Sequence, residues 1–203
     1  RFIFWYVLVG LCIFMVFAML LTACSGGGTT ETEGGADPGG DAPKIAILMH
    51  SVADDFIYSV YEAAEARAKE HGFETIFADA KNDANAQAGT IEDVIMQGVD
   101  GIMLCPVDAS ALSDSVAKIN EANIPVVLVD RTIDEGNFVA VCQSDNYNFG
   151  YQGAEQIVEA AKKAGIAIED LKVLELQGDL ASTSGLERSQ GFQKAAEDLG
   201  LNI

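Results

Sequence analysis

The chain has 203 residues, with 31 acidic and 12 basic side chains and a formal net charge of −19. Phosphate backbones are bound by concentrated basic surfaces, so this balance argues against a nucleic-acid partner. The four cysteines form no CxxC pair and no cluster with histidine along the sequence. We therefore expect no zinc or redox motif, and no cofactor.

The first 23 residues are almost continuously apolar, with Arg1 in front and no acid before Glu31. Such a segment is a targeting or membrane segment and not part of the fold. Its length would allow an uncleaved transmembrane anchor. However, Leu21-Thr22-Ala23-Cys24 resembles the lipobox of bacterial lipoprotein signal peptides, in which the peptidase cuts before a cysteine that carries lipid. We predict a signal peptide over 1–23 and lipidation of Cys24.

Residues 24–43 are rich in Gly, Thr and acid and contain little that could be buried, which predicts a flexible acidic linker. Globular sequence begins at Lys44. The chain has no initiator Met, and it stops at Ile203, where a helix has just ended and a strand would begin. We expect it to be a fragment of a longer protein.

From Lys44 onward, short apolar runs alternate with segments of helical periodicity. The helical segments show Ile57, Val60 and Ala64, then Ile91 and Val94, then Val116 and Ile119, at spacings of three or four. Strands that are apolar on both faces belong to a covered parallel sheet. This pattern predicts an α/β doubly wound first lobe over 44–145. The predicted strands are 44–50, 73–79, 100–106, 124–130 and 138–144.

A second alternation begins at residue 146, with a predicted helix over 146–164, a strand over 171–177 and a helix that carries Leu186 to Leu199. The chain therefore enters a second α/β lobe over 146–203 and ends inside it. Cys105 and Cys142 should remain unpaired, because their strands are expected to be separated by a third, which exceeds the reach of a disulfide.

Ligands of open parallel sheets lie beyond the carboxyl ends of the strands. After the first strand, ADDF puts Asp54 and Asp55 on one turn, so their side chains point apart and a catalytic pair is disfavoured. We interpret Asp54 as a ligand residue and Asp55 as the helix cap. Phe56 supplies a flat face that could stack on a ring or fasten the helix to the sheet.

Other residues at these strand ends could also meet a ligand. Asp130-Arg131 offers a carboxylate beside a planar donor, which suits vicinal hydroxyls, and a surface ion pair is the alternative. Arg188 is a similar candidate from the second lobe. His50 either contacts ligand or is structural. The stretch 79–85 lacks the glycine of a calcium loop, and the first turn lacks the glycines of a phosphate site.

Several blocks together carry a family signature: ILMHSVADDF, the Asp-Arg of ANIPVVLVDRT, QSDNYNFG and ELQGDLASTSGLERSQGF. In order and spacing they resemble the periplasmic sugar-binding proteins of the ribose and galactose type, from Lys44 to Ile203. The resemblance implies a type I periplasmic-binding-protein fold of two lobes, the second incomplete here. It places Asp54, Phe56, Asp130, Arg131 and Arg188 on the sugar, with glucose-type and ribose-type features mixed.

The resemblance also implies a function without catalysis: a monomeric lipoprotein that binds a monosaccharide and delivers it to the permease of an ABC importer. It would be anchored by lipid on the outer face of the cytoplasmic membrane. The alternatives are the sensing ectodomain of a chemoreceptor or histidine kinase, and the effector domain of a LacI-type repressor. The acidic linker disfavours the repressor, which needs a basic DNA-binding segment before the first strand.

Overall fold

The computed structural model describes residues 42–203. The predicted signal peptide (1–23), Cys24 and most of the predicted linker lie outside the described residues. Over 42–203, no helix has both the length and the apolar character needed to cross a bilayer.

The first lobe is built on a five-stranded parallel sheet with the order β2-β1-β3-β4-β5. Since β3 and β5 are separated by β4, the predicted spacing of Cys105 and Cys142 is confirmed, and both thiols are free. The strands fall within the predicted ranges: β1 (Lys44–Met49), β2 (Glu74–Asp79), β3 (Gly101–Leu104), β4 (Val126–Val129) and β5 (Ala140–Cys142).

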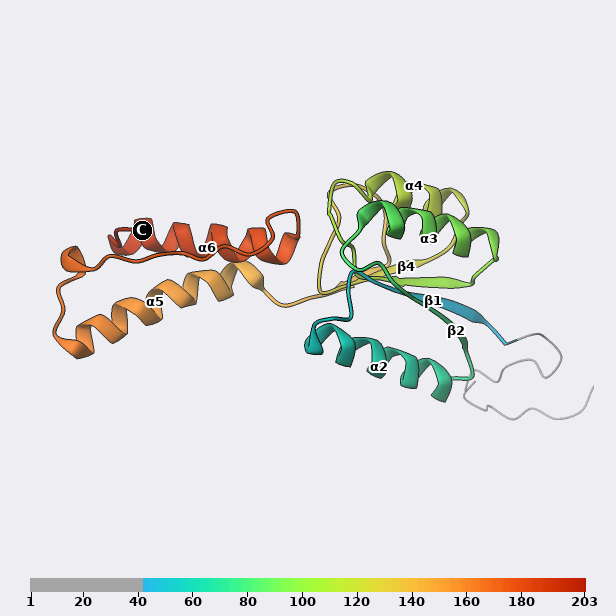
Figure 1. Ribbon diagram of the computed structural model, residues 1–203, viewed down its shortest axis with the longest axis horizontal. Helices are drawn as coiled ribbons and strands as arrows, with labels where there is room; N and C mark the ends of the chain where they lie inside the picture. Colours follow the sequence, from blue (N-terminus) through green and yellow to red (C-terminus); the bar gives the residue numbers. More distant parts are fainter. Residues whose placement is uncertain (1–41) are drawn as a thin grey trace, which may run out of the picture. The chain divides into compact units, whose positions relative to one another are not determined.

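Three helices connect the strands and lie on both faces of the sheet. Figure 1 shows α3 (Ala84–Met96) and α4 (Ser113–Glu121) on one face and α2 (Asp55–Glu70) on the other. The strand order therefore switches between β1 and β3, which are parallel neighbours: the chain goes from β1 outward to β2 on one side, and β3, β4 and β5 follow on the other. In doubly wound sheets, this switch point is where a crevice opens at the carboxyl ends of the strands.

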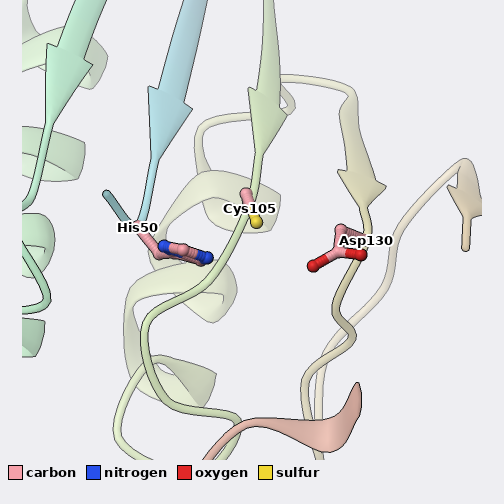
Figure 2. Close-up of side chains that lie close together, drawn as sticks. All are labelled: His50, Cys105 and Asp130. Carbon is pink, nitrogen blue, oxygen red and sulfur yellow. The ribbon is translucent and has the colours of Figure 1, made fainter. Parts of the chain in front are cut away.

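The carboxyl ends of β1, β3 and β4 lie beside one another at a single edge (Figure 2). The residue that directly follows each strand is His50, Cys105 and Asp130, respectively. Parallel register therefore brings together three side chains that are 55 and 25 positions apart in the sequence.

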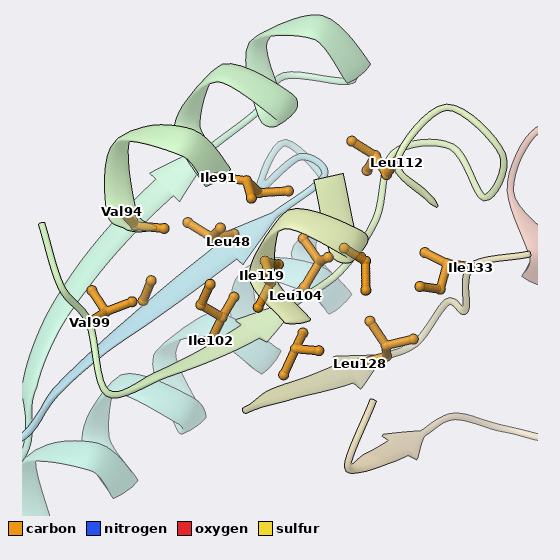
Figure 3. Packing of buried hydrophobic residues seen from close by; sticks show 13 residues of the cluster. Leu48, Ile91, Val94, Val99, Ile102, Leu104, Leu112, Ile119, Leu128 and Ile133 are labelled. Atoms are coloured by element: carbon orange, nitrogen blue, oxygen red, sulfur yellow. The ribbon is translucent and has the colours of Figure 1, made fainter. Parts of the chain in front are cut away.

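The main core lies between the sheet and the α3–α4 layer (Figure 3). Leu104 from β3 and Leu128 from β4 meet Ile119 from α4, and all three are fully buried. A smaller cluster on the α2 side joins Ile47, Met49, Ile57, Cys105 and Val129. The edge that carries His50, Cys105 and Asp130 is thus fixed from both faces.

The α2 face is covered only in part by the described residues. One helix is about 10 Å wide, so it spans roughly two strands at 4.8 Å spacing. On the α2 face Val127 remains 36% exposed, and on the opposite face Val141 of the edge strand β5, which pairs in register with Leu128, remains 37% exposed. For residues 42–203, the expectation that the whole sheet is covered on both faces is therefore met only in part: α2 leaves Val127 exposed, and the α3–α4 layer leaves the edge strand β5 exposed.

The second lobe consists of two packed helices, α5 (Asn146–Ala164) and α6 (Thr183–Leu199), with a 3-10 turn, η1 (Ile168–Asp170). α5 has the predicted bounds. Two glycines allow the helices to touch closely: a Cβ at Gly150 would meet the carbonyl oxygen of Arg188, and one at Gly191 would meet that of Tyr147. Larger residues there would push the helices apart.

The predicted strand over 171–177 is wrong for the described chain, where this segment is extended but not part of a sheet. A strand exists through its hydrogen-bonded partner. Here the Val173 N–H donates to the Asn202 carbonyl oxygen, and no strand of residues 146–203 lies alongside. Leu174 and Leu176 are consequently 83% and 88% exposed.

The sequence also predicts N-caps at Asp83 and Asp108, each before a helical run, and a helix end at His71–Gly72; of these, only Asp108 needs correction. Asp83 does cap α3, where its side chain accepts from Asn85 N and Ala86 N. Asp108 accepts from Ser110 N and Ala111 N in the same manner, but α4 begins only at Ser113, so Asp108 stabilises a separate turn. The expected end of α2 is confirmed, with His71 as C-cap and Gly72 at φ +76°.

Candidate functional site

All of the predicted ligand residues except Arg188, together with Cys105, come from the carboxyl edge of the first lobe. His50, Cys105 and Asp130 form a tight cluster: an imidazole nitrogen, the sulfur and a carboxylate oxygen all lie within 4.8 Å of one another. In Figure 2 these three side chains extend from neighbouring strand ends toward a shared space. The histidine and the cysteine are buried, and the aspartate is partly buried.

Asp130 has an unusual backbone conformation. Its φ is +62°, and the Arg131 N–H donates to the Val129 carbonyl oxygen over 2.7 Å, which closes a three-residue turn. Its own N–H donates to Cys142 O, so the strand pairing of β4 with β5 continues up to this residue. A positive φ at a residue other than glycine costs on the order of 1–3 kcal/mol and concentrates at functional sites.

Arg131 is held mainly by backbone carbonyl groups. Its Nη1 donates to the carbonyl oxygens of Val107 over 3.3 Å and Pro106 over 3.5 Å. Its Nε lies 3.8 Å from Oδ2 of Asp130, close enough for charge attraction but too far for a hydrogen bond. The Nε is therefore a buried donor without a hydrogen-bond partner among the described residues.

His50 is 5% exposed, and its Nδ1 likewise has no hydrogen-bond partner within residues 42–203. Burial, followed by the Arg131 charge, lowers the pKa of His50 from 6.5 to about 4. The imidazole is thus neutral at pH 7, with one donor and one acceptor nitrogen. A neutral imidazole can bond a hydroxyl group in either direction.

Cys105 is completely buried, and burial raises its thiol pKa to about 12. Its backbone is fixed by Gln87 of α3, which is 1% exposed. Gln87 Nε2 donates to Cys105 O over 2.9 Å, and Gln87 Oε1 accepts from Val107 N over 2.8 Å. One side chain therefore holds both sides of the turn after β3.

The roles expected for the two adjacent acids are partly reversed. Asp54, not Asp55, is the N-cap of α2, and its Oδ1 accepts from Phe56 N at 2.8 Å and Ile57 N at 3.0 Å. Asp55 is the first helical residue and is exposed. The cap needs an extended backbone, which Asp54 has at φ −93° and ψ 128°. Since the cap uses one oxygen of Asp54, the other remains open to a ligand.

Phe56 is 60% exposed and lines a groove of about 690 Å³ between α2 and the uncovered part of the sheet. Most of the groove is lined by apolar side chains. Asp130 and Ser144 lie at one end of it, so a polar ligand would bind there and not along the apolar remainder.

Arg188 belongs to a different local network from Asp130. It is on α6, and its Nε donates to Asn146 Oδ1 over 2.9 Å. Asn146 is 1% exposed, begins α5, and donates from Nδ2 to Ser144 O. Arg188 is thereby tied to the segment 144–146, where the chain passes between the lobes.

Two residues of this region were missed from the sequence: Cys105 and Gln87. The first was treated as an apolar strand end, and we expected no cysteine–histidine cluster. Spacing along the chain reveals local metal motifs, whereas the approach of His50 to Cys105 depends on strand order. The glutamine could have been noticed as the polar residue within the apolar stripe of its helix.

Comparison with known proteins agrees with this architecture. The family model described as "Periplasmic binding protein domain" matches residues 45–203. The chain is 33% identical over 182 residues to the ribose import binding protein RbsB of Bacillus subtilis, with coverage of 88% of this chain and 56% of that protein. The chain therefore belongs to the periplasmic binding protein family, a family of binding proteins.

Two solved structures place the fold in the same class. One is the binding protein component of the arabinose ABC transporter from Shewanella sp. ANA-3, bound to L-arabinofuranose, with TM-score 0.68, 28% identity, and coverage of 79% of this chain and 52% of that one. The other is the fructose binding periplasmic domain of the hybrid two-component system BT1754, with TM-score 0.70, 25% identity, and coverage of 77% and 50%. The chain spans about half the length of these relatives.

Proposed function

We propose that this chain is part of a substrate-binding lipoprotein of an ABC importer, which binds a monosaccharide between two lobes and delivers it to a permease. The protein acts by binding and not by catalysis. The ribose and arabinose import proteins among its relatives support the ligand class and the importer.

The observation that carries the proposal is the pair of unpartnered polar groups at the strand ends. His50 Nδ1 and Arg131 Nε are buried without hydrogen-bond partners among the described residues. Leaving such a group unpaired costs on the order of 1–3 kcal/mol. Hydroxyl groups that sit beside Asp130 would pair both of them, because a hydroxyl is donor and acceptor at once.

In this proposal Asp130 and Arg131 bind vicinal hydroxyls, the open oxygen of Asp54 and the imidazole of His50 bind others, and Phe56 covers one face of the ring. Arg188 contributes from the second lobe. A ligand that bridges both lobes favours the closed state, and the segment 144–146 is one of the hinges.

Thermal-shift screening of the whole protein against pentoses, hexoses and polyols tests the ligand class. A bound sugar at 100 times its Kd stabilises the native state by about 2.7 kcal/mol, which raises the melting midpoint. We expect a shift with at least one pentose or hexose. No shift with any member of the panel would contradict the proposed ligand class.

The position of the protein at the membrane is a separate part of the proposal. Lipidation of Cys24 would tether the binding lobes on the outer face of the cytoplasmic membrane, through the predicted linker up to residue 43. The second candidate, a sensing ectodomain, is favoured by the likeness to the fructose binding domain of a two-component system. A sensor would keep its anchor uncleaved and its Cys24 free of lipid.

Metabolic labelling with a palmitate analogue separates these two candidates. The importer lipoprotein predicts label on the wild-type protein and none on Cys24→Ala, with Cys12→Ala as the matched control that keeps the label. Absence of label on the wild type, or label that survives Cys24→Ala, would contradict lipidation at this residue and favour the sensor.

A further inference from the structure

Beyond the sugar site, the strand ends place three different metal-ligating groups together. His50, Cys105 and Asp130 each follow one of three adjacent parallel strands, and their ligand atoms lie within 4.8 Å of one another. Figure 2 shows the imidazole and the carboxylate on either side of the sulfur. We propose that these residues form a binding site for a divalent cation of the zinc type, which competes with the sugar for Asp130.

The ligand set selects the class of metal. An imidazole nitrogen, a thiolate and a carboxylate are the usual protein ligands of zinc, whereas magnesium and calcium require a shell of oxygen atoms. At metal–ligand distances of 2.0–2.3 Å, ligands of a tetrahedral ion are about 3.4–3.8 Å apart. The ligand atoms lie within 4.8 Å of one another, about 1 Å beyond this range, so coordination requires a small movement of the side chains.

A second observation, independent of the cysteine, is that the imidazole of His50 lacks a partner. His50 is 95% buried, since 5% of its surface is exposed, and its Nδ1 has no hydrogen-bond partner among the described residues. A buried imidazole nitrogen without a partner can be satisfied by a metal ion as well as by a hydroxyl group. Three protein ligands would leave the fourth coordination position to water.

Charge balance favours the dication at this depth. A thiolate and a carboxylate together carry two negative charges, so a bound dication gives these three ligands and the ion a net charge of zero. Asp54 and Asp79 add negative potential at His50. Arg131 opposes the cation, but its Nη1 is already bonded to the carbonyl oxygens of Pro106 and Val107. Coordination replaces the thiol proton of Cys105, which passes to solvent.

The site would control ligand capture through two groups that the sugar also uses, the Asp130 carboxylate and the His50 imidazole. Competition between the metal and the sugar rests on the proposed function, because that function assigns the Asp130 carboxylate to sugar hydroxyls. An ion that binds this carboxylate removes the acceptor that the sugar needs. Metal binding by itself makes no use of the sugar assignment.

Cobalt(II), a spectroscopic substitute for zinc, tests the metal site in the whole protein. We expect one cobalt per chain with a thiolate-to-cobalt charge-transfer absorption, displaced by zinc and unaffected by magnesium. Cys105→Ser should abolish the absorption, and His50→Gln should raise the cobalt Kd by at least about 100-fold. The matched controls Cys142→Ser and His71→Gln should bind cobalt as the wild type does.

Any of three results would contradict the proposed metal site: the absorption persists in Cys105→Ser, it is lost in Cys142→Ser, or the wild type does not show it. Melting midpoints without metal verify that each variant folds. If Cys105→Ser does not fold, Asp130→Asn, which keeps side-chain size, takes its place.

Titration of an identified sugar in the presence of zinc then tests competition: the apparent sugar Kd should rise with zinc in the wild type and not in Cys105→Ser. An unchanged sugar Kd with zinc bound would contradict competition and leave the cobalt result standing.

Discussion

Gln87 Nε2 donates a hydrogen bond over 2.9 Å to the carbonyl oxygen of Cys105, the residue of the candidate site that directly follows β3. The same amide accepts from Val107 N over 2.8 Å. Because Arg131 in turn bonds the carbonyl oxygens of Pro106 and Val107, this glutamine in α3 supports the position of the guanidinium.

Replacing Gln87 by Ala should lower the free energy of unfolding by about 2–4 kcal/mol, because two buried backbone groups lose their partners. Urea unfolding of the whole protein measures this loss. The matched control is Gln97→Ala, at the exposed C-cap of the same helix, which should stay within about 0.5 kcal/mol of wild type. An equal loss of stability in the two variants would contradict the role of Gln87 in bonding both Cys105 O and Val107 N.

Asp54 has two roles that substitutions can separate. Asp54→Ala should lose the cap, at about 1 kcal/mol of stability, together with ligand affinity. Asp54→Ser retains a capping oxygen, so it should keep the stability and still weaken sugar binding in calorimetry. Asp55→Ala should change neither by much. Wild-type sugar affinity in Asp54→Ser would show that Asp54 is a cap alone.

The stability of the first lobe should fall in acid because of His50. Its pKa is about 4 in the folded state against 6.5 ordinarily, so between these pH values the unfolded chain binds the extra proton. Stability from this group is therefore complete above pH 6.5 and is lost as the pH falls toward 4, by on the order of 3 kcal/mol. Arg131 opposes protonation, whereas Asp54, Asp79 and Asp179 favour it.

Denaturant unfolding between pH 4 and pH 7 measures this dependence. His50→Gln should flatten the curve over that range, and His71→Gln, an exposed histidine, should leave it as in the wild type. Parallel curves for wild type and His50→Gln would mean that burial of the imidazole does not lower its pKa.

The core between the sheet and the α3–α4 layer should be sensitive to cavities. Leu104 is 0% exposed and contacts the cluster shown in Figure 3, so Leu104→Ala should cost about 2–5 kcal/mol. Met96→Ala removes a side chain that is 77% exposed and should stay within about 0.5 kcal/mol. Thermal unfolding compares the two. A small loss for Leu104→Ala would contradict the packing of β3 described above.

The sequence predicted the elements whose signals are local. The helix over 146–164 has the predicted bounds, because its apolar period and Gly165 at φ +72° act within the segment. The strands of the first lobe were identified from their apolar runs. The strand expected at 171–177 has the same apolar run but no partner within 42–203, and a sheet requires pairing that one segment does not encode.

The candidate site was predictable to the extent that it follows from strand ends. His50 and Asp130 were identified because they follow apolar runs. The approach of Cys105 to both depends on strand order, and the conformation of Asp130 depends on the turn that Arg131 closes. The cap of α2 was assigned to Asp55 instead of Asp54, because sequence patterns do not locate the start of a helix to within one residue.

The most direct test of the central claim is calorimetric titration of the whole protein with the monosaccharide identified by screening, for wild type and Asp130→Asn. Removing the charge of a carboxylate that accepts sugar hydroxyls should weaken binding by about 10- to 100-fold, since hydrogen bonds to charged groups contribute about 1.5–3 kcal/mol. Asp134→Asn, an exposed acid four residues away, should bind as the wild type does. An Asp130→Asn protein with wild-type sugar affinity would contradict the assignment of the sugar to these strand ends.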